Sequence, residues 1–374
     1  MTPVNDVVQL TQDLVAIPSA SQISNVPVSD YLQQWLDDSG FEIERYSYRD
    51  GYGEKVILVA MKGEGSGGMA FCSHSDTVPG QEEDWDPYDP VIRDGLMYGR
   101  GSCDMKGPLA ATMIAAASVD PAKLKKPIYI VVTSDEELGL TGAKYLAEVS
   151  GNILDRLRPE YGIIAEPTSM SPVYSHKGYG RIFVTARGRA AHSSTGKGVS
   201  ANFLIAPFLA DMAEMARTFL TDESFMNHDF DPPSNGFNMV ISDGECPINV
   251  TAPKSTCHLS FRAMPDSRVE DVIEMVSEKA RSYDLEVEAV SSGPLYVAPD
   301  SELVKSALAA TGNSKPTTVP YGTDGIYLQS MISQMVVLGP GDIGVAHTVG
   351  EYVPVAELNQ AVDVYKTLIQ QFCM

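Results

Sequence analysis

The segment PIYIVVTSDEELG, residues 127–139, decides the fold that this sequence predicts. Its part at 128–132, IYIVV, is a continuous run of β-branched and aromatic residues, typical of a strand buried on both faces of a parallel sheet. Asp135, Glu136 and Glu137 follow at the carboxyl end, where open α/β sheets bind ligands. Adjacent carboxylates repel one another, so they require cations, hydrogen bonds or raised pKa values. The segment therefore predicts a metal site, with a solvated acidic turn before the next helix as the alternative.

Length and composition favour a globular protein with more than one domain. The 374 residues exceed what one hydrophobic core usually supports, and the hydrophobic content of 44% is ample for a core. Lys and Arg number 27 against 49 Asp and Glu, so the net charge is -22. Such a charge argues against nucleic acid and anionic membranes as partners. An anionic substrate would then require a local positive group.

The N-terminus and the cysteines indicate a cytoplasmic protein. The opening MTPVNDVVQLTQDL contains no basic segment followed by an apolar one, and no apolar run in the chain reaches about 18 residues. The five cysteines are odd in number and form no CxxC pair, which argues against a disulfide framework. We therefore expect a soluble protein in a reducing compartment.

Hydrophobic periodicity outlines the first and last parts of the chain. The first helix is expected to have Thr2 as its cap and Pro3 in its first turn. Apolar residues at helical spacing, or in short continuous runs, predict the elements that follow. The helices are expected at 27–39, 108–118, 141–150, 302–310 and 355–373, and the strands at 41–48, 56–61, 69–72, 128–132, 161–165 and 335–338.

Further metal-ligand side chains follow other apolar strands. His74 and Asp76 come directly after one of these, on the same side because side chains alternate along a strand. One of the two can bind a metal while the other orients it. Glu166 follows a second strand and His347 lies in the loop after a third. A lone histidine is more often a hydrogen-bonded loop residue, but these strand ends together predict a single site.

The segment GRGSCDMKG at 99–107 contributes a further carboxylate. It could be mistaken for a dinucleotide-binding loop, but Asp104 stands where the third glycine should be. A phosphate would not bind beside that carboxylate. Glycines around an aspartate instead suit a backbone that bends to bring the carboxylate into a crowded site.

Residues 173–291 follow a different pattern. The order of predicted elements is strand, helix, strand, strand, helix and strand, at 180–186, 201–220, 238–242, 256–263, 268–283 and 285–290. This β-α-β-β-α-β order is that of a small open-faced sandwich. We expect an inserted α+β domain at 173–291, and a catalytic domain formed by 1–172 and 292–374.

Five motifs resemble the signatures of the M20 family of dinuclear zinc amidohydrolases. In chain order they are SHSDTVP, YGRGSCDMKG, TSDEELG, IIAEPT and GPGDIGVAHTVGEYV. They span the chain in the order of the family. The resemblance implies an α/β fold, in which a zinc-peptidase-like catalytic domain with a mixed central sheet flanked by helices carries an inserted dimerisation or lid domain. It implies metal-dependent hydrolysis of the amide bond of an N-acyl amino acid.

The resemblance also implies a role for each metal-site residue. Asp104 bridges two divalent metal ions, most simply Zn²⁺ with Co²⁺ as the alternative. His74 and Glu166 complete one ion, and Glu137 and His347 the other. Nitrogen and carboxylate ligands suit catalytic Zn²⁺, and a close metal pair activates a bridging water and polarises the scissile carbonyl.

The resemblance also implies roles for residues that do not bind metal. Asp76 orients the imidazole of His74, and Glu136 is the general base. His192, in AAHSSTG, resembles the family histidine that reaches the active site of a partner subunit, which implies a homodimer through the inserted domain. Arg262, in SFRAMP, resembles the arginine that pairs with the substrate carboxylate, and Asn249 resembles a nearby polar contact. For His192 the alternative is a hydrogen-bonded turn residue, and for Arg262 a surface salt bridge.

Two other classes of protein fit the sequence less well. A serine hydrolase is disfavoured because the chain contains no GxSxG. A non-catalytic metal- or peptide-binding protein on the same fold is the stronger alternative. Glu136 discriminates against it, since in this scheme Glu136 binds no metal and is required only for chemistry.

Overall fold

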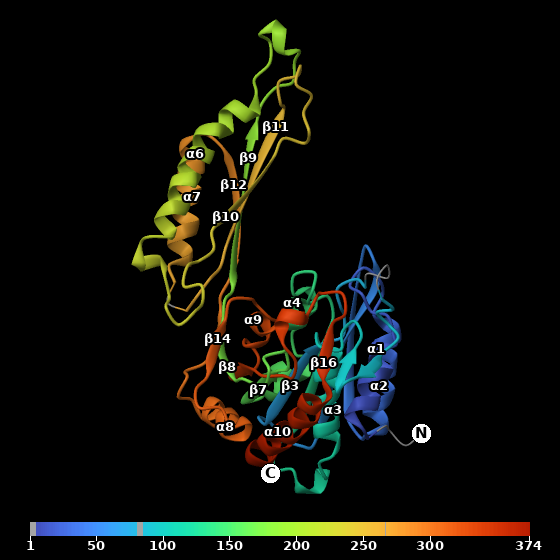
Figure 1. Ribbon diagram of the computed structural model, residues 1–374. Coiled ribbons are helices and arrows are strands. Elements are labelled where there is room, and N and C mark those ends of the chain that lie inside the picture. Colours follow the sequence, from blue (N-terminus) through green and yellow to red (C-terminus); the bar gives the residue numbers. More distant parts are fainter. Residues whose placement is uncertain (1–4, 81–84, 266) are drawn as a thin grey trace. The chain divides into compact units, whose positions relative to one another are not determined.

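The chain folds into two compact units, whose elements are labelled in Figure 1. Unit 1 consists of Met1–Ser175, Tyr296–Thr317 and Thr323–Met374, and unit 2 of His176–Leu295 and Thr318–Gly322. The computed structural model describes residues 5–80, 85–265 and 267–374, so Thr2 and Pro3 lie outside the described part. The short segment Thr318–Gly322 was expected in the catalytic domain. It packs with unit 2 because Thr318 Oγ1 donates a hydrogen bond to the carbonyl of Asp229.

Unit 1 is built on a mixed sheet. Its strands, in spatial order, are β1 (Glu42–Asp50), β2 (Gly53–Lys62), β6 (Ile128–Thr133), β3 (Met69–His74), β7 (Tyr161–Ile164), β15 (Gln334–Val337), β8 (Val173–His176) and β13 (Leu295–Tyr296), with β14 (Thr317–Val319) paired to β8. The four central strands β6, β3, β7 and β15 run parallel to one another. Strands β1, β2 and β8 pair antiparallel. The carboxyl ends of the four parallel strands therefore meet at one edge.

The strand predicted at 128–132 is β6, the first of these parallel strands in spatial order. All six residues of β6 are buried, as expected for a strand covered on both faces. Its register places Val131 beside Cys72 of β3 and Val59 of β2. The mixed α/β fold expected from the sequence is confirmed.

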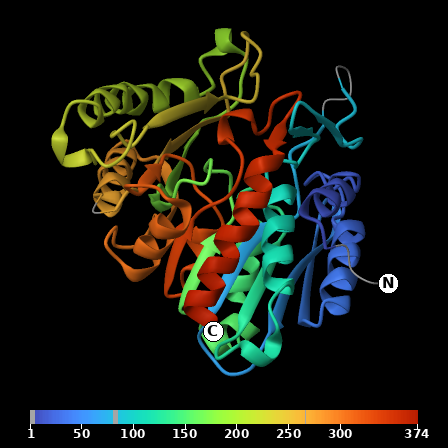
Figure 2. The same cartoon turned by 60° about the horizontal axis from the view of Figure 1, so that its bottom comes forward.

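The helices of unit 1 are α1 (Val7–Val15), α2 (Val26–Asp38), α3 (Lys106–Ala117), α4 (Thr141–Glu148), α5 (Ile153–Leu157), α8 (Glu302–Thr311), α9 (Gly325–Leu328) and α10 (Val355–Cys373). Helices α3 and α10 lie side by side along the sheet (Figure 2). Their apolar residues share one core with α1, α2, α8 and the central strands, including Phe71, Ile130 and Val336. The cap of α1 is Asp6, whose carboxylate accepts a hydrogen bond from the backbone nitrogen of Val8.

A small antiparallel sheet in unit 1 was not expected. It consists of β16 (Tyr352–Pro354), β5 (Leu96–Tyr98) and β4 (Val91–Arg93). Three residues are too few for a recognisable alternating pattern, which is why the sequence indicated only loops here. This sheet joins the segment before Asp104 to the segment after His347.

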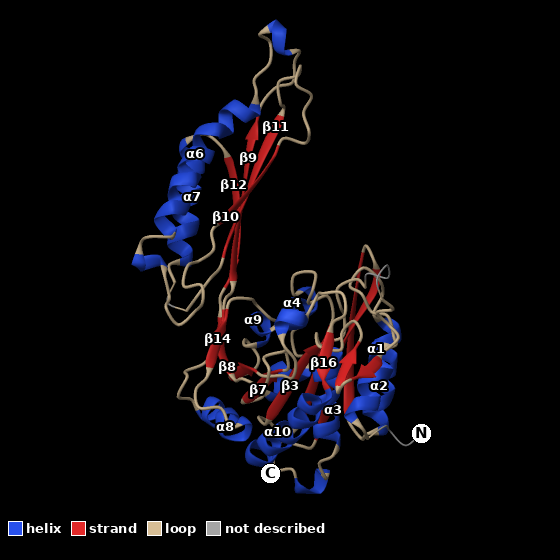
Figure 3. Cartoon of the chain, in the orientation of Figure 1, coloured by secondary structure: helices blue, strands red, loops and turns tan. Residues whose placement is uncertain are grey.

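Unit 2 has the β-α-β-β-α-β order that the sequence predicted. Its elements are β9 (Tyr179–Arg187), α6 (Ala201–Phe219), β10 (Asn238–Ser242), β11 (Lys254–Phe261), α7 (Val269–Ser282) and β12 (Glu286–Ser292). The strands form an antiparallel sheet in the order β10, β11, β9, β12. Helices α6 and α7 cover one face of it (Figure 3), and Ile182, Leu259 and Phe208 belong to their shared core. Within the described residues of both units, no helix is long and apolar enough to cross a membrane.

Candidate metal centre

The carboxyl edge of the parallel strands in unit 1 gathers the predicted ligands. His74 is the last residue of β3, Glu137 follows β6, Glu166 follows β7, and His347 lies on the loop after β15. Gly339 begins that loop. A Cβ there would lie 2.3 Å from the carbonyl oxygen of Ala165, so only glycine allows the loop to approach the Glu166 segment this closely.

Asp104 lies between the two histidines. Its Oδ1 atom is 3.1 Å from His74 Nε2, and its Oδ2 atom is 3.1 Å from His347 Nε2. Each oxygen of one carboxylate therefore faces a different imidazole. Glu166 Oε1 lies 3.5 Å from His74 Nε2, and Glu137 Oε1 lies 2.9 Å from His347 Nε2. The five residues thus form two sets that share Asp104.

The donors of this cluster fit divalent cations. Ligand atoms of His74, Asp104 and Glu137 all lie within 4.8 Å of one another. Three carboxylates and two imidazoles are the borderline and hard donors that Zn²⁺ and related ions prefer. His74, Asp104 and Glu166 are at most 6% exposed, so mutual repulsion of the carboxylates is poorly screened by water. A cation bound among them would relieve that repulsion.

The pKa values of the ligands reflect this crowding. Burial raises the pKa of Glu166 well above its usual range, and the charge of Asp104 adds to the effect. Hydrogen bonds to Asp104 and Glu137 raise the pKa of His347 to about 10. Burial lowers the pKa of His74, but its hydrogen bonds to Asp104 and Asp76 outweigh burial and raise that pKa well above the usual value. In the absence of a metal, protons on these groups therefore supply the positive charge that the carboxylates require.

The turn after β6 separates the three adjacent carboxylates. Asp135 has a φ of +53°, and its side chain turns away from the cluster. Its carboxylate accepts hydrogen bonds of 2.7 Å from Lys55 Nζ and 2.7 Å from the Tyr48 hydroxyl. Lys55 is fully buried, so this ion pair fixes the turn to β2. Asp135 takes no part in the cluster, whereas Glu137 belongs to it and Glu136 lies beside it.

Asp76 holds both His74 and the acidic turn. His74 Nδ1 donates to the backbone carbonyl of Asp76 at 2.9 Å, and Asp76 Oδ1 lies 3.5 Å from the same nitrogen. The carboxylate of Asp76 accepts hydrogen bonds of 3.3 Å from the backbone nitrogens of Glu136 and Glu137, and one of 2.7 Å from Ser21 Oγ. The expected orientation of His74 by Asp76 is thus made chiefly by the main chain.

Glu136 has the electrostatic environment of a general base. Burial raises its pKa well above the usual range. The charge of His74 opposes that shift, and the charges of Glu166 and Asp324 add to it. A carboxylate with a raised pKa accepts a proton more readily near neutral pH. The proposed role of Glu136 therefore agrees with its surroundings.

Asp324 is a buried acid to which the sequence assigned no role. It accepts a hydrogen bond from Thr133 Oγ1, and its Oδ1 atom is buried without a hydrogen-bond partner. Burial raises its pKa to about 7. It lies close enough to Glu136 and Glu166 to raise their pKa values. The signal available in the sequence was an aspartate between Thr323 and Gly325 in a short glycine-flanked segment, a pattern too common to identify a site.

The predicted residues of unit 2 lie at opposite ends of its sheet. His192 is exposed, and the nitrogen of its neighbour Ser193 donates to the carbonyl of Asn249 at 2.9 Å. These residues lie beyond the end of β9. Arg262 follows the last residue of β11, which pairs with Gly180 near the start of β9. The length of β9 therefore puts about 20 Å between Arg262 and His192 of one chain.

Arg262 is exposed and lies near a second cation. Its backbone nitrogen donates to the carbonyl of Asn235 at 2.7 Å. Burial lowers the pKa of Lys177 to about 8, and the charge of Arg262 adds to that shift. Lys177 Nζ donates to the carbonyls of Pro232 and Ser234 at 2.7 and 2.8 Å. Arg262 thus has a second cation, Lys177, as a neighbour, and the charge of Asp231 acts on Lys177 in the opposite direction.

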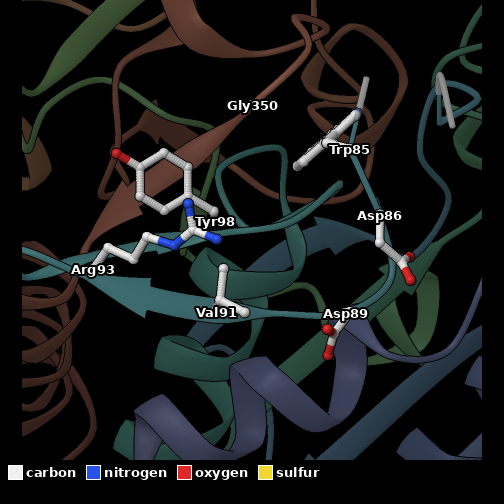
Figure 4. Close-up of a pocket in the computed structure, with 7 residues that line it drawn as sticks. All are labelled: Trp85, Asp86, Asp89, Val91, Arg93, Tyr98 and Gly350. Atoms are coloured by element: carbon white, nitrogen blue, oxygen red, sulfur yellow. The ribbon is translucent and has the colours of Figure 1, made fainter. Parts of the chain in front are cut away.

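A hollow of about 380 Å³ lies beside the small sheet of unit 1 (Figure 4). Most of the residues that line it are aromatic or charged: Trp85, Asp86, Asp89, Arg93 and Tyr98, together with Val91 and Gly350. None of the predicted ligands lines this hollow, so it is distinct from the cluster around Asp104.

The sequence as a whole matches a known family. The model of "Peptidase family M20/M25/M40" matches residues 70–371, which include every residue of the cluster. Solved structures with the same fold include an aminopeptidase from Bacillus cereus, with a TM-score of 0.72, 20% identity and 99% coverage of both chains. An M20 family metallo-carboxypeptidase from Sulfolobus solfataricus gives a TM-score of 0.73 at 15% identity, over 97% of this chain and 98% of that chain. This chain therefore belongs to the M20/M25/M40 peptidase family and is a hydrolase.

Relatives of known name are more similar in sequence. An acetylornithine deacetylase from Myxococcus xanthus is 36% identical over 374 aligned residues, which cover 96% of each protein. An acetylornithine deacetylase from Photorhabdus laumondii is 30% identical over 98% of this chain and 97% of the relative. These similarities extend over both units and are not confined to the catalytic motifs.

Proposed function

We propose that this protein hydrolyses the amide bond of an N-acyl amino acid, and that its substrate is N2-acetyl-L-ornithine, which yields L-ornithine and acetate. The observation that carries the reaction type is the placement of Asp104 between His74 and His347, with Glu136 beside them. The observation that favours this substrate is the near full-length similarity to relatives named acetylornithine deacetylase. The reaction would belong to arginine biosynthesis.

Two divalent cations fit the cluster, and we propose Zn²⁺, with Co²⁺ as a functional substitute. His74, Asp104 and Glu166 would hold one ion, and Asp104, Glu137 and His347 the other. When bound, such a pair lowers the pKa of a bridging water and polarises a carbonyl oxygen. One solved structure of the same fold, from Bacillus subtilis, is described as a dinuclear metal-binding peptidase of the M20 family, at 16% identity and a TM-score of 0.66.

Glu136 would carry the proton in this reaction. Its raised pKa suits a carboxylate that accepts a proton from the attacking water and then delivers it to the leaving amine nitrogen. Asp76 would keep Glu136 in place by accepting the hydrogen bond from its backbone nitrogen. Neither step requires Glu136 to bind metal, which separates this proposal from a non-catalytic metal-binding protein.

Arg262 would bind the carboxylate of the substrate. It is an exposed guanidinium near a second cation, Lys177, and a guanidinium forms paired hydrogen bonds with a carboxylate. Removing the carboxylate from the substrate should then lower kcat/KM by about the same factor as removing the Arg262 side chain. A surface arginine without this role would show no such dependence on the substrate's charge.

The separation of Arg262 and His192 favours a homodimer. An N-acyl amino acid is much shorter than the length of β9, so one chain cannot supply both residues to one substrate. We propose that His192 and Asn249 act on the active site of a second copy of this chain, where His192 would stabilise the oxyanion. The exposed position of both residues supports this role.

The experiment that tests the substrate is a ranked panel of N-acyl amino acids with Zn²⁺ or Co²⁺ added. It includes N-acetylornithine, N-acetylcitrulline, N-acetylmethionine, N-succinyl-diaminopimelate and a dipeptide with a free C-terminal carboxylate. We expect N-acetylornithine to have the highest kcat/KM. A higher value for the succinyl compound, another N-acyl amino acid or the dipeptide would assign the protein to desuccinylases, other deacylases or carboxypeptidases respectively. The amide of N-acetylornithine, measured with wild type and Arg262→Ala, tests the carboxylate contact in the same assay.

A further inference from the structure

Glu351 is a buried acid outside the ligand set that binds the loop carrying Asp104. Its side chain is fully buried. A single oxygen, Oε1, accepts hydrogen bonds from three backbone nitrogens of that loop: Gly101 at 3.0 Å, Cys103 at 2.9 Å and Asp104 at 2.9 Å. Gly101 has a φ of +85°, a conformation that favours glycine. The bent loop thus aims its N–H groups at one carboxylate oxygen and leaves the side chain of Asp104 free to face the histidines.

The same carboxylate ties this loop to the segment carrying His347. The other oxygen of Glu351, Oε2, lies 2.5 Å from Arg100 Nη1, and Arg100 Nη2 donates to the carbonyl of Thr348 at 3.2 Å. The backbone nitrogen of Gly99 donates to the carbonyl of Glu351 at 3.0 Å. Arg100 is 1% exposed, so its charge depends on Glu351 for compensation. Two segments about 250 residues apart in the chain are joined at one ion pair.

We propose that Glu351 is a positioning residue that fixes Asp104 against His347, so that the two cation sites sharing Asp104 form together. The inference rests on the metal cluster of the proposed function and not on its substrate. A side chain with a single acceptor oxygen, such as glutamine, could not accept hydrogen bonds from both the three N–H groups and the guanidinium. Asp104 would then lose its fixed orientation toward one or both histidines. The expected result is weaker binding of the second cation before any effect on substrate binding.

The principal test is Glu351→Gln, which keeps the size of the side chain and removes its charge. Equilibrium dialysis against Zn²⁺, and separately against Co²⁺, gives the number of cations bound and their Kd values. We expect the Kd of the more weakly bound cation to rise at least about ten-fold, as is usual when a group that orients ligands is lost. The visible absorption of the Co²⁺ form should also change, because it reports ligand geometry and not fold stability.

A stability-matched control separates positioning from general destabilisation. Leu32→Ala removes a fully buried side chain of α2 that belongs to the same core and lies outside the ligand loops. It should lower the Tm of the metal-free protein, as we expect of Glu351→Gln, but leave both Kd values and the Co²⁺ absorption unchanged. If Leu32→Ala weakens cation binding as much as Glu351→Gln, the effect belongs to stability and the proposal fails.

Arg100→Lys keeps the test decisive if Glu351→Gln does not fold. A lysine retains the charge but cannot bond both Glu351 and the carbonyl of Thr348 in the fixed geometry of a guanidinium. We expect a several-fold rise in the Kd of the second cation. Wild-type Kd values and Co²⁺ absorption in whichever of these variants folds would overturn the proposal. Failure of the wild type itself to bind two cations would instead refute the proposed metal site.

Discussion

His74 and Asp76 are joined through the main chain: Nδ1 of the imidazole donates to the carbonyl oxygen of Asp76 at 2.9 Å, and the nearer carboxylate oxygen is 3.5 Å away. Because the carbonyl orients the ring, the carboxylate is available for other partners. It accepts the backbone N–H groups of Glu136 and Glu137. Asp76 thus contacts the proposed general base, Glu136, and a proposed ligand of the second cation, Glu137, as well as His74.

Asp76→Asn should separate the effect of the Asp76 carboxylate on Glu136 and Glu137 from the effect of the Asp76 carbonyl on His74. The substitution leaves the carbonyl that orients His74, but the side chain keeps only one oxygen to accept hydrogen bonds. We expect kcat to fall roughly ten-fold or more, while the number of bound cations stays at the wild-type value. The measurement is turnover and cation content on the same sample. A loss of cations with little change in kcat would mean that the carboxylate acts mainly on the imidazole.

Glu136→Gln and Glu137→Gln should have opposite signatures. Glu136→Gln removes the proton acceptor and keeps the shape, so kcat should fall by roughly 10²-fold or more with full cation content. Glu137→Gln should weaken cation binding itself, because an amide oxygen carries no net charge. Normal turnover by Glu136→Gln, or loss of cations from that variant, would show that the roles of the two neighbours are wrongly assigned.

Chelation should abolish amide hydrolysis. The cluster contains three carboxylates and two imidazoles and supplies no activated nucleophile of its own in this scheme. Exhaustive dialysis against a chelator should therefore remove activity, and added Zn²⁺ or Co²⁺ should restore it. Mg²⁺ at the same concentration is the control, since it prefers oxygen ligands and should restore little. Full activity in verified metal-free protein would end the dinuclear proposal.

Subunit mixing should reveal the role of His192. Samples of Glu136→Gln and His192→Ala, each inactive as a homodimer, are unfolded, mixed and refolded together. In a mixed dimer, the subunit with intact Glu136 would receive His192 from its partner, so one site is complete. Random pairing then gives roughly a quarter of wild-type activity. No recovery, in a mixture shown to contain mixed dimers, would place His192 on its own chain's site or outside catalysis.

The stability of the metal-free protein should fall as pH rises. The pKa of His347 is raised from 6.5 to about 10 in the folded state, so its contribution is complete below about pH 6.5 and is lost as pH approaches 10. The raised pKa of Glu166 acts in the same direction, because the unfolded chain ionises first. Tm, measured in chelator between about pH 6.5 and 9.5, should decrease, and His347→Gln should reduce the slope. A Tm that rises over this range would contradict the prediction.

Local patterns were sufficient to predict most of the fold. Strand β6 could be recognised because its apolar run is too short for a helix, is rich in β-branched residues and is bounded by turn signals. All six of its residues are buried. The strand β10 and the helix α10 have the predicted bounds. The small sheet of β4, β5 and β16 could not be recognised, since its pairing depends on segments more than 250 residues apart.

The candidate site was predictable for residues at strand ends and not for those that support them. His74, Glu166 and the pair Glu136 and Glu137 end strands, so the edge of a parallel sheet brings them together. The ion pair between Asp135 and Lys55 could not be predicted from the local sequence, because the two residues meet only when β2 pairs with β6. Glu351 was within a quoted motif, but its three backbone contacts arise from the folded loop.

The place of β15 inside the sheet, between β7 and β8, sets an order of events during synthesis. A ribosome releases β7 and β8 long before β15. β7 can pair with β3 on one side, but neither β7 nor β8 can pair with β15 until most of the chain has emerged. Unit 2, whose second segment ends at Gly322, precedes β15 in the chain. Because His347 follows β15, a nascent chain can carry a finished unit 2 while the sheet of unit 1 is open and the last of the proposed ligands is not yet made. With the proposed ligand set, both cation sites would be complete only after β15 and His347 have been made, and a chain that stops short of β15 exposes unpaired strand edges that favour aggregation.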